Sequence, residues 1–184
     1  MRRWLFALLV LGSGLSGADE TVRVCNGYGC LVQTDIRYTE GQLGVVRRML
    51  FAAVNPENER KTLAEAIGRL YGWAGEQSDI HNDRGGNFAD DNVSGKMDCI
   101  DHSTSTTRLL QLLEVRNYLR WHRVIEREPR YFAGVFVAHW SAVIEEKTDG
   151  EAARFVVDSW FVDNGQPAVI LPLDEWKKGA GPDV

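Results

Sequence analysis

The sequence predicts an α+β protein, in which helices and antiparallel strands occupy separate stretches of the chain. Capping signals at Thr39, Asn55 and Asp98 each precede apolar residues at helical spacing. From residue 120 onward, β-prone runs alternate with turn signals, which is typical of a β-meander. We therefore expect an N-terminal hairpin and two helices, and then a third helix packed on an antiparallel β-meander.

Residues 1–18 have the pattern of a secretory signal peptide. A basic pair precedes the apolar run Trp4–Leu11, and small residues follow at Ser16–Ala18. The apolar run is far shorter than the roughly 20 residues that a membrane-spanning helix needs. We predict cleavage after Ala18, which leaves a single domain at 19–184 in the periplasm or outside the cell, with no stable membrane anchor. The alternative is an uncleaved amphipathic core helix.

The chain is acidic. Its formal net charge is −5 at pH 7, and removal of residues 1–18 takes away two arginines and makes the charge −7. Binding to nucleic acid requires clustered lysine and arginine side chains that neutralise phosphates. The composition therefore argues against a nucleic acid as partner.

The three cysteines differ in their surroundings. Cys25 and Cys30 flank a turn rich in glycine between two β-prone runs, so residues 21–38 are predicted to form a hairpin with a Cys25–Cys30 disulfide. This pairing leaves Cys99 alone. An odd thiol in an exported chain pairs between molecules, stays buried and inert, or is reactive.

Two helices are predicted after the hairpin. Thr39 and Gln42 form a capping-box pattern at the start of the first, which should stop at Asn55 and Pro56. Asn55 then caps the second, whose apolar residues recur at helical spacing. We expect both helices to be structural.

The segment 77–96 has no periodicity and is rich in glycine, asparagine and aspartate, so a long functional loop is expected there. It leads to Asp98, which should cap a third helix with Asp101 as the acid at the third position. Cys99 then lies at the helix N-terminus, on the same face as Leu110.

The C-terminal part is predicted to form strands at 120–126, 132–146, 153–163 and 168–173. If the turn before the third strand centres on Asp149 and Gly150, opposed residue numbers sum to 299, and His139 lies diagonal to Asp158 on one face. A sum of 297 would oppose the two residues directly, and a sum of 298 would separate them. The Asp-Gly pair favours 299.

Cys99, His139 and Asp158 are therefore the candidate catalytic residues. The N–H groups at a helix N-terminus favour a thiolate, and a nearby imidazole adds to this effect. A carboxylate on the far ring nitrogen fixes the tautomer. The three side chains would act as nucleophile, general acid/base and orienting group, and N–H groups at the helix start would stabilise an oxyanion. Because Asp98 and Asp101 oppose a thiolate, we expect their carboxylates to be engaged in capping.

This order of Cys, His and Asp resembles the transglutaminase-like branch of the papain-like superfamily. MDCIDH at 97–102 is similar to the Asp-Cys-Glu-Asp signature of bacterial transglutaminase-like cysteine peptidases, some of which act in the periplasm on surface adhesins. The likeness covers about 94–165 and implies a transglutaminase-like core at about 94–175. It also implies that Trp160, in the run DSW, covers the histidine–aspartate bond. These peptidases use the acids of the signature to bind calcium. In this chain Ile100 stands in place of the glutamate of the signature, so the resemblance does not decide whether calcium binds here.

The remaining histidines suggest weaker alternatives. His102 could replace His139 as base, or form a zinc pair with His122 or His81, but structural zinc sites need more thiolates than this chain offers. We therefore predict neither metal nor cofactor. His102 is expected on the helix surface or at the rim of the site, and His122 half-exposed on a strand. The acidic loop 79–91 lacks the glycine of an EF-hand and is expected to be solvated.

The predicted function is that of an exported thiol-dependent peptidase or amidase, which forms an acyl-thioester on Cys99 and acts on a protein or peptide of the cell envelope. A lysine amine in place of water would make it a transglutaminase-type acyltransferase. The other alternative is a catalytically silent envelope binding module. The lack of a Cys-x-x-Cys pair argues against a thiol-redox role.

Overall fold

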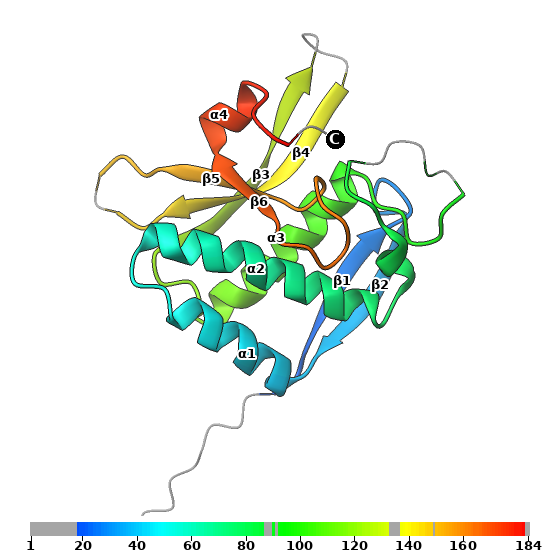
Figure 1. Ribbon diagram of the computed structural model, residues 1–184, viewed down its shortest axis with the longest axis horizontal. Coiled ribbons are helices and arrows are strands. Elements are labelled where there is room, and N and C mark those ends of the chain that lie inside the picture. Colours follow the sequence, from blue (N-terminus) through cyan, green and yellow to red (C-terminus); the bar gives the residue numbers. More distant parts are fainter. Residues whose placement is uncertain (1–17, 87–89, 91, 133–136, 149, 183–184) are drawn as a thin grey trace, which may run out of the picture.

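A computed structural model describes residues 18–182 except 87–89, 91, 133–136 and 149 (Figure 1). The predicted signal peptide lies, apart from Ala18, outside the described residues. The described part contains four α-helices, a two-stranded antiparallel sheet and a four-stranded antiparallel sheet. The predicted α+β class is confirmed. No helix in this part is long and apolar enough to cross a bilayer.

The first sheet is the predicted hairpin, formed by β1 (Glu20–Asn26) and β2 (Val32–Tyr38). The structure contains the predicted disulfide between Cys25 and Cys30. All four residues from Gly27 to Cys30 have positive φ, between 60° and 81°. Such a conformation is unfavourable for residues other than glycine, so contacts elsewhere in the protein must hold this turn.

Helices α1 (Glu40–Phe51) and α2 (Pro56–Gly75) begin where the capping signals predict. The Thr39 hydroxyl accepts a hydrogen bond from the backbone N–H of Gln42, and the Asn55 side chain accepts one from that of Asn58. Each bond satisfies an N–H group that a helix start otherwise leaves free.

Helix α3 (Cys99–Val115) is in contact with both sheets, with β1 on one side and with β3 (His122–Phe132) and β4 (Val137–Glu146) on the other (Figure 1). The four-stranded sheet has the order β3–β4–β5–β6, in which β5 is Arg154–Asp158 and β6 is Val169–Pro172. Ala142, Ile144 and Val157 pack into the main core with α2 and α3. Val143 and Val156 point to the opposite face, where a second cluster includes Trp176 of the short helix α4 (Leu173–Lys177). Each face of the sheet is therefore packed, and the N-terminus of α3 lies between the two clusters, because Cys99 packs against the second.

Strand boundaries differ from the prediction in this sheet. The observed strands are β3 (His122–Phe132), β4 (Val137–Glu146), β5 (Arg154–Asp158) and β6 (Val169–Pro172). The predicted single strand at 132–146 is wrong, since Phe132 belongs to β3 and pairs with Val137 of β4. The segment 159–163, predicted as strand, leaves the sheet after β5, and the short helix α4 (Leu173–Lys177) has no counterpart in the prediction.

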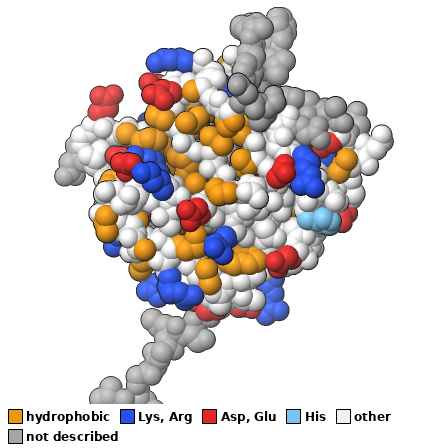
Figure 2. Space-filling view, viewed as in Figure 1, with side chains coloured by type: hydrophobic (Ala, Val, Ile, Leu, Met, Phe, Trp, Pro, Cys, Tyr) orange, Lys and Arg blue, Asp and Glu red, His pale blue; other side chains and the backbone are white. Residues whose placement is uncertain are grey.

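One face of the molecule carries interspersed acidic and basic side chains, and its hydrophobic side chains gather over β6 and α4 (Figure 2). The net negative charge of the chain is therefore not concentrated on this face.

His122 is fully buried, which corrects the prediction of a half-exposed residue. Its Nδ1 lies 2.8 Å from Oε1 of Glu59, a fully buried carboxylate of α2. The same carboxylate accepts hydrogen bonds from the backbone N–H groups of Arg120, Trp121 and His122. Burial acts to raise the pKa of Glu59, but these bonds outweigh it and hold the pKa below its ordinary value. Helix α2 is thus joined to the start of β3 by a charged side chain.

Replacing Glu59 with glutamine is expected to lower the free energy of unfolding by about 3 kcal/mol. A carboxamide has one acceptor oxygen, so buried donors of the 120–122 segment would face its NH2 group. Urea denaturation measures the change. Glu57→Gln is the matched control, because Glu57 lies in the same helical turn but is exposed and pairs with Lys61 at the surface. Equal midpoints for the two variants would contradict the role assigned to Glu59.

Candidate active site

The candidate site begins with a hydrogen bond between His139 of β4 and Asp158 at the end of β5. The observed β4–β5 pairs, such as Ala142 with Val157, have numbers that sum to 299, as the Asp-Gly turn predicts. His139 and Asp158 therefore lie diagonally on one face of the sheet. The His139 Nε2 is 2.7 Å from the Asp158 Oδ2, and both residues are buried.

Two tryptophans hold the Asp158 carboxylate in place. The indole N–H of Trp176 donates to Oδ2 at 3.0 Å, and the backbone N–H of Trp160 donates to Oδ1 at 3.2 Å. The Trp160 ring lies 4.8 Å from the imidazole of His139, between ring centroids. Trp176 lies 5.6 Å from it, and its place in the core agrees with the expectation that this tryptophan is a core residue or part of the cleft wall. Its bond to Asp158 was not predicted, because α4 is too short to give a periodic signal. These rings exclude water from the His139–Asp158 pair.

Cys99 is the first residue of α3 and is half-buried. Its thiol lies 3.8 Å from the carbonyl oxygen of Ala138, the residue before His139. The side chain is therefore beside the His139 segment of β4. It also remains partly open to solvent, as a nucleophile for an external substrate must.

The protonation state of the His139 imidazole depends on both Asp158 and Cys99. Burial acts to lower the pKa of the imidazole, but hydrogen bonds to Asp158 and to Cys99, together with their charges, outweigh it and raise the pKa to about 9. His139 is therefore an imidazolium at neutral pH. Since Asp158 occupies Nε2, we assign the Cys99 thiol to the Nδ1 side of the ring. The arrangement therefore places a cysteine side chain beside an imidazolium that is bonded to a carboxylate.

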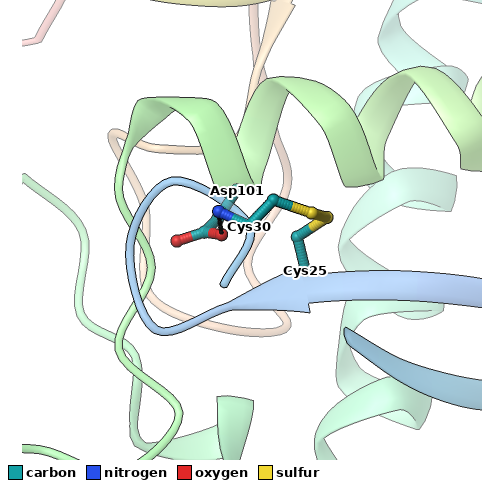
Figure 3. Close-up of side chains that lie close together, drawn as sticks. All are labelled: Cys25, Cys30 and Asp101. Carbon is teal, nitrogen blue, oxygen red and sulfur yellow. Dashed lines mark hydrogen bonds between the residues drawn. A yellow bond between two sulfur atoms is a disulfide. The ribbon is translucent and has the colours of Figure 1, made fainter. Parts of the chain in front are cut away.

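The acids beside Cys99 are engaged, as predicted. Asp98 accepts hydrogen bonds from the N–H groups of Ile100 and Asp101, and Asp101 accepts one from that of Asp98. Both acids also bind the left-handed turn of the hairpin: Asp98 accepts from Gly29 N–H, and Asp101 from Tyr28 N–H. Asp101 also accepts from the N–H of Cys30 (Figure 3). These contacts account for the unusual turn conformation. They also fix the start of α3 to the disulfide hairpin.

The backbone N–H of Cys99 itself has no acceptor within the described part of the chain, whereas those of Ile100 and Asp101 are bound to Asp98. Of the helix-start donors expected to stabilise an oxyanion, the Cys99 N–H is therefore the one available to a substrate carbonyl.

His102 is buried, which corrects its expected place on the helix surface or at the rim of the site. Its Nδ1 is 2.9 Å from the Ser159 hydroxyl, and its Nε2 is 3.0 Å from the Asp83 carboxylate. Asp83 also accepts a hydrogen bond from Met97 N–H at 2.8 Å. Hydrogen bonds through Asp83 and His102 thus link Met97, two residues before Cys99, with Ser159, the residue that follows Asp158. They form a supporting network that joins α3 to the end of β5.

The acidic loop is less solvated than expected, because Asp83 and Asp90 are both buried. Asp91, its last residue, lies outside the described part. The zinc alternative is not favoured by the positions of the histidines: His102 bonds Asp83 and Ser159, His122 bonds Glu59, and His81 lies at the surface and contacts the Ser78 carbonyl. Among the described residues, one group of candidate ligand atoms lies close enough for a metal, formed by Cys25, Cys30 and Asp101. Its two sulfurs are bonded to each other (Figure 3).

Comparisons of this chain with protein-family models, with curated proteins and with solved structures find no match. A function for this chain is therefore inferred from its residues and their geometry.

Proposed function

We propose that the protein is an exported thiol-dependent peptidase or amidase, in which Cys99 attacks an amide carbonyl, His139 transfers the proton and Asp158 orients His139. The observation that carries the proposal is the position of the His139 imidazole, bonded to Asp158 at 2.7 Å and beside Cys99, with its pKa raised to about 9. Buried acids and histidines with other roles are common, but this pair adjoins a half-exposed thiol at a helix start.

The reaction follows from the protonation states. The thiolate of Cys99 adds to the substrate carbonyl, whose oxygen accepts a hydrogen bond from the Cys99 N–H. The imidazolium gives its proton to the departing amine as the carbon–nitrogen bond breaks, which leaves an acyl-thioester. Neutral His139 then takes a proton from water, and the hydroxide attacks the thioester. Cleavage of the carbon–sulfur bond releases the acid and restores the thiolate–imidazolium pair.

We infer further that the segment from about 94 to 175 is a transglutaminase-like core. The support is the order of the elements: a helix with cysteine at its start, then histidine and aspartate on neighbouring antiparallel strands. The proposed substrate is a protein or peptide of the cell envelope. The disulfide of the hairpin is consistent with an oxidising compartment.

Mixing the protein with p-nitrophenyl acetate tests the proposal, because this activated ester acylates a reactive thiol without a specific substrate. We expect a burst of about one p-nitrophenol per chain, followed by slow turnover. Mass spectrometry of the quenched protein should place the acetyl group on Cys99. Blocking the thiol with iodoacetamide beforehand should remove the burst.

Adding a primary amine such as glycine ethyl ester shows whether water or an amine accepts the acyl group from Cys99. Release of acetate alone supports hydrolysis, whereas acetylated amine as the main product supports acyl transfer. Absence of both burst and Cys99 acetylation, in protein that unfolds cooperatively, would contradict the proposed function.

A further inference from the structure

A groove runs along α3 on its β3 and β4 side, and its nearest wall residue on the helix, Thr107, lies about 12 Å along the helix axis from the proposed nucleophile Cys99. Its volume is about 490 Å³, and its walls include Thr107 and Gln111 of α3, Glu126 and Arg127 of β3, and Trp140 of β4. Ser103 and Thr104, which Arg127 contacts, lie just over one helical turn beyond Cys99. At 1.5 Å per residue, this places them about 6–8 Å along the helix axis from Cys99. A peptide bound at Cys99 can therefore reach Arg127, a wall residue of the groove, with a side chain one or two residues from the cleaved bond.

The Arg127 guanidinium is held in a defined orientation. One nitrogen, Nη1, donates to the Ser103 hydroxyl at 3.1 Å and to the Thr104 hydroxyl at 2.6 Å. The guanidinium carbon lies 5.6 Å from the centroid of a Trp140 ring, within the range of a cation–π contact. Neutral groups thus fix the position of a charged side chain.

The other edge of this guanidinium is unused. Its Nε and Nη2 have no acceptor, and no carboxylate pairs with Arg127, within the residues that the structure describes. Other arginines of the same sheet do pair with acids, as Arg123 and Arg154 do with Glu145. The Nε and Nη2 edge is one that binds a carboxylate through two parallel hydrogen bonds.

A second cation lies nearby. Arg108 of α3 donates to the carbonyl of Arg23 and to the side chain of Gln33, both neutral acceptors. Burial lowers the pKa of Arg108, and the charges of Arg23 and Arg127 lower it further, so Arg127 lies close enough to Arg108 for the two charges to interact. Glu126 is the acidic residue among the groove walls. Because the negative charge of Glu126 lies among the same walls as the positive charge of Arg127, the groove suits a ligand with a single carboxylate and not a polyanion.

We propose that the groove is a substrate subsite for an acidic side chain, so that peptides whose aspartate or glutamate reaches Arg127 are attacked by Cys99 in preference to their amide counterparts. This inference rests on the proposed function, since it concerns the substrate of the same nucleophile. It assigns to Arg127 a role in specificity, through direct contact with the substrate.

Paired peptidyl chloromethyl ketones test the subsite, because their reaction with a thiolate displaces chloride and labels Cys99 irreversibly. Each pair carries glutamate or glutamine at the first, second or third residue before the reactive group, with alanine elsewhere. The rate of Cys99 labelling is followed by mass spectrometry of the full chain. We expect glutamate to be preferred about tenfold at one of these positions, as the order of magnitude of a charge-assisted bidentate contact. The preference should weaken with added salt.

Variants of Arg127 test whether this side chain causes the preference for glutamate over glutamine. Arg127→Gln should bring the glutamate-to-glutamine ratio close to one, and Arg127→Lys should retain part of it, because lysine keeps the charge but not the bidentate geometry. Arg123→Gln is the matched control, as it removes the same charge from the same strand at a residue paired with Glu145, and it should keep the full preference. The rate of labelling by neutral iodoacetamide should be the same in all of these proteins, which verifies that α3 and Cys99 are intact.

Equal rates for glutamate and glutamine at every position, or an undiminished preference in Arg127→Gln, would overturn the subsite and leave the proposed function standing. Failure of all the peptide reagents to label Cys99, while iodoacetamide labels it, would count against the proposed function itself.

Discussion

Replacing Cys99 with serine is expected to lower the turnover of p-nitrophenyl acetate at least about 10³-fold. The hydroxyl of serine is far less acidic than a thiol, so the proton transfer that creates the thiolate–imidazolium pair does not occur. The raised pKa of His139, about 9 in the native protein, depends in part on Cys99 and should fall in the variant.

The substitution is nearly isosteric, and the free energy of unfolding should change by less than about 1 kcal/mol. Urea denaturation therefore separates loss of activity from loss of fold. A catalytically silent binding module makes the opposite prediction, because Cys99→Ser would leave its ligand binding and its cellular phenotype unchanged. Residual turnover above one tenth of the native value would contradict the assignment of Cys99 as nucleophile.

Replacing Asp158 with asparagine is the second change with a large expected effect, a loss of about 10³- to 10⁴-fold in the same turnover. The carboxylate accepts from the His139 ring and the Trp176 indole at Oδ2, and from Trp160 N–H at Oδ1. Asparagine offers one acceptor oxygen, so its NH2 must face at least one of these donors. It also removes the negative charge that stabilises the imidazolium, which should lower the pKa of His139.

Asp174→Asn is the matched control for this variant. Asp174 lies two residues before Trp176 in α4 and is exposed. Its Oδ2 lies 3.6 Å from the Nζ of Lys178. The control removes the same charge from the same region without touching the His139–Asp158 pair, so its turnover should equal that of the native protein. Similar losses in both variants would indicate a general electrostatic effect and contradict the orienting role of Asp158.

Local signals in the sequence were sufficient for the helix starts and for the central pair of the site. The caps at Thr39, Asn55 and Asp98 act on N–H groups within three residues, so their effect can be inferred from short motifs. The relation between His139 and Asp158 follows from the register of one hairpin, which its Asp-Gly turn indicates.

Burial of single polar residues could not be predicted in the same way. His122 is buried because Glu59, from a different helix, satisfies its ring, and His102 is buried because Asp83 and Ser159 do so. These partners are distant in the sequence and come together only through tertiary packing. A polar side chain is normally assigned to the surface, and only its hydrogen-bond partners make burial acceptable. The bond between Trp176 and Asp158 could not be predicted for a related reason, since it depends on the docking of a five-residue helix.

The most direct test of the account compares the alkylation of Cys99 by iodoacetate and by iodoacetamide from pH 6 to pH 10. The two reagents differ in charge, so the ratio of their rates reports positive charge beside the sulfur. Because the pKa of His139 is raised to about 9, the imidazolium is present below that pH and is lost above it.

We therefore predict that the rate ratio favours iodoacetate at neutral pH and falls as the pH rises through about 9, and that the fall moves to lower pH in Asp158→Asn. A ratio that stays constant over the whole range, or a native protein in which Cys99 reacts only as an ordinary thiol does, above a pH of about 8, would contradict the central claim that Cys99 and His139 form an ion pair.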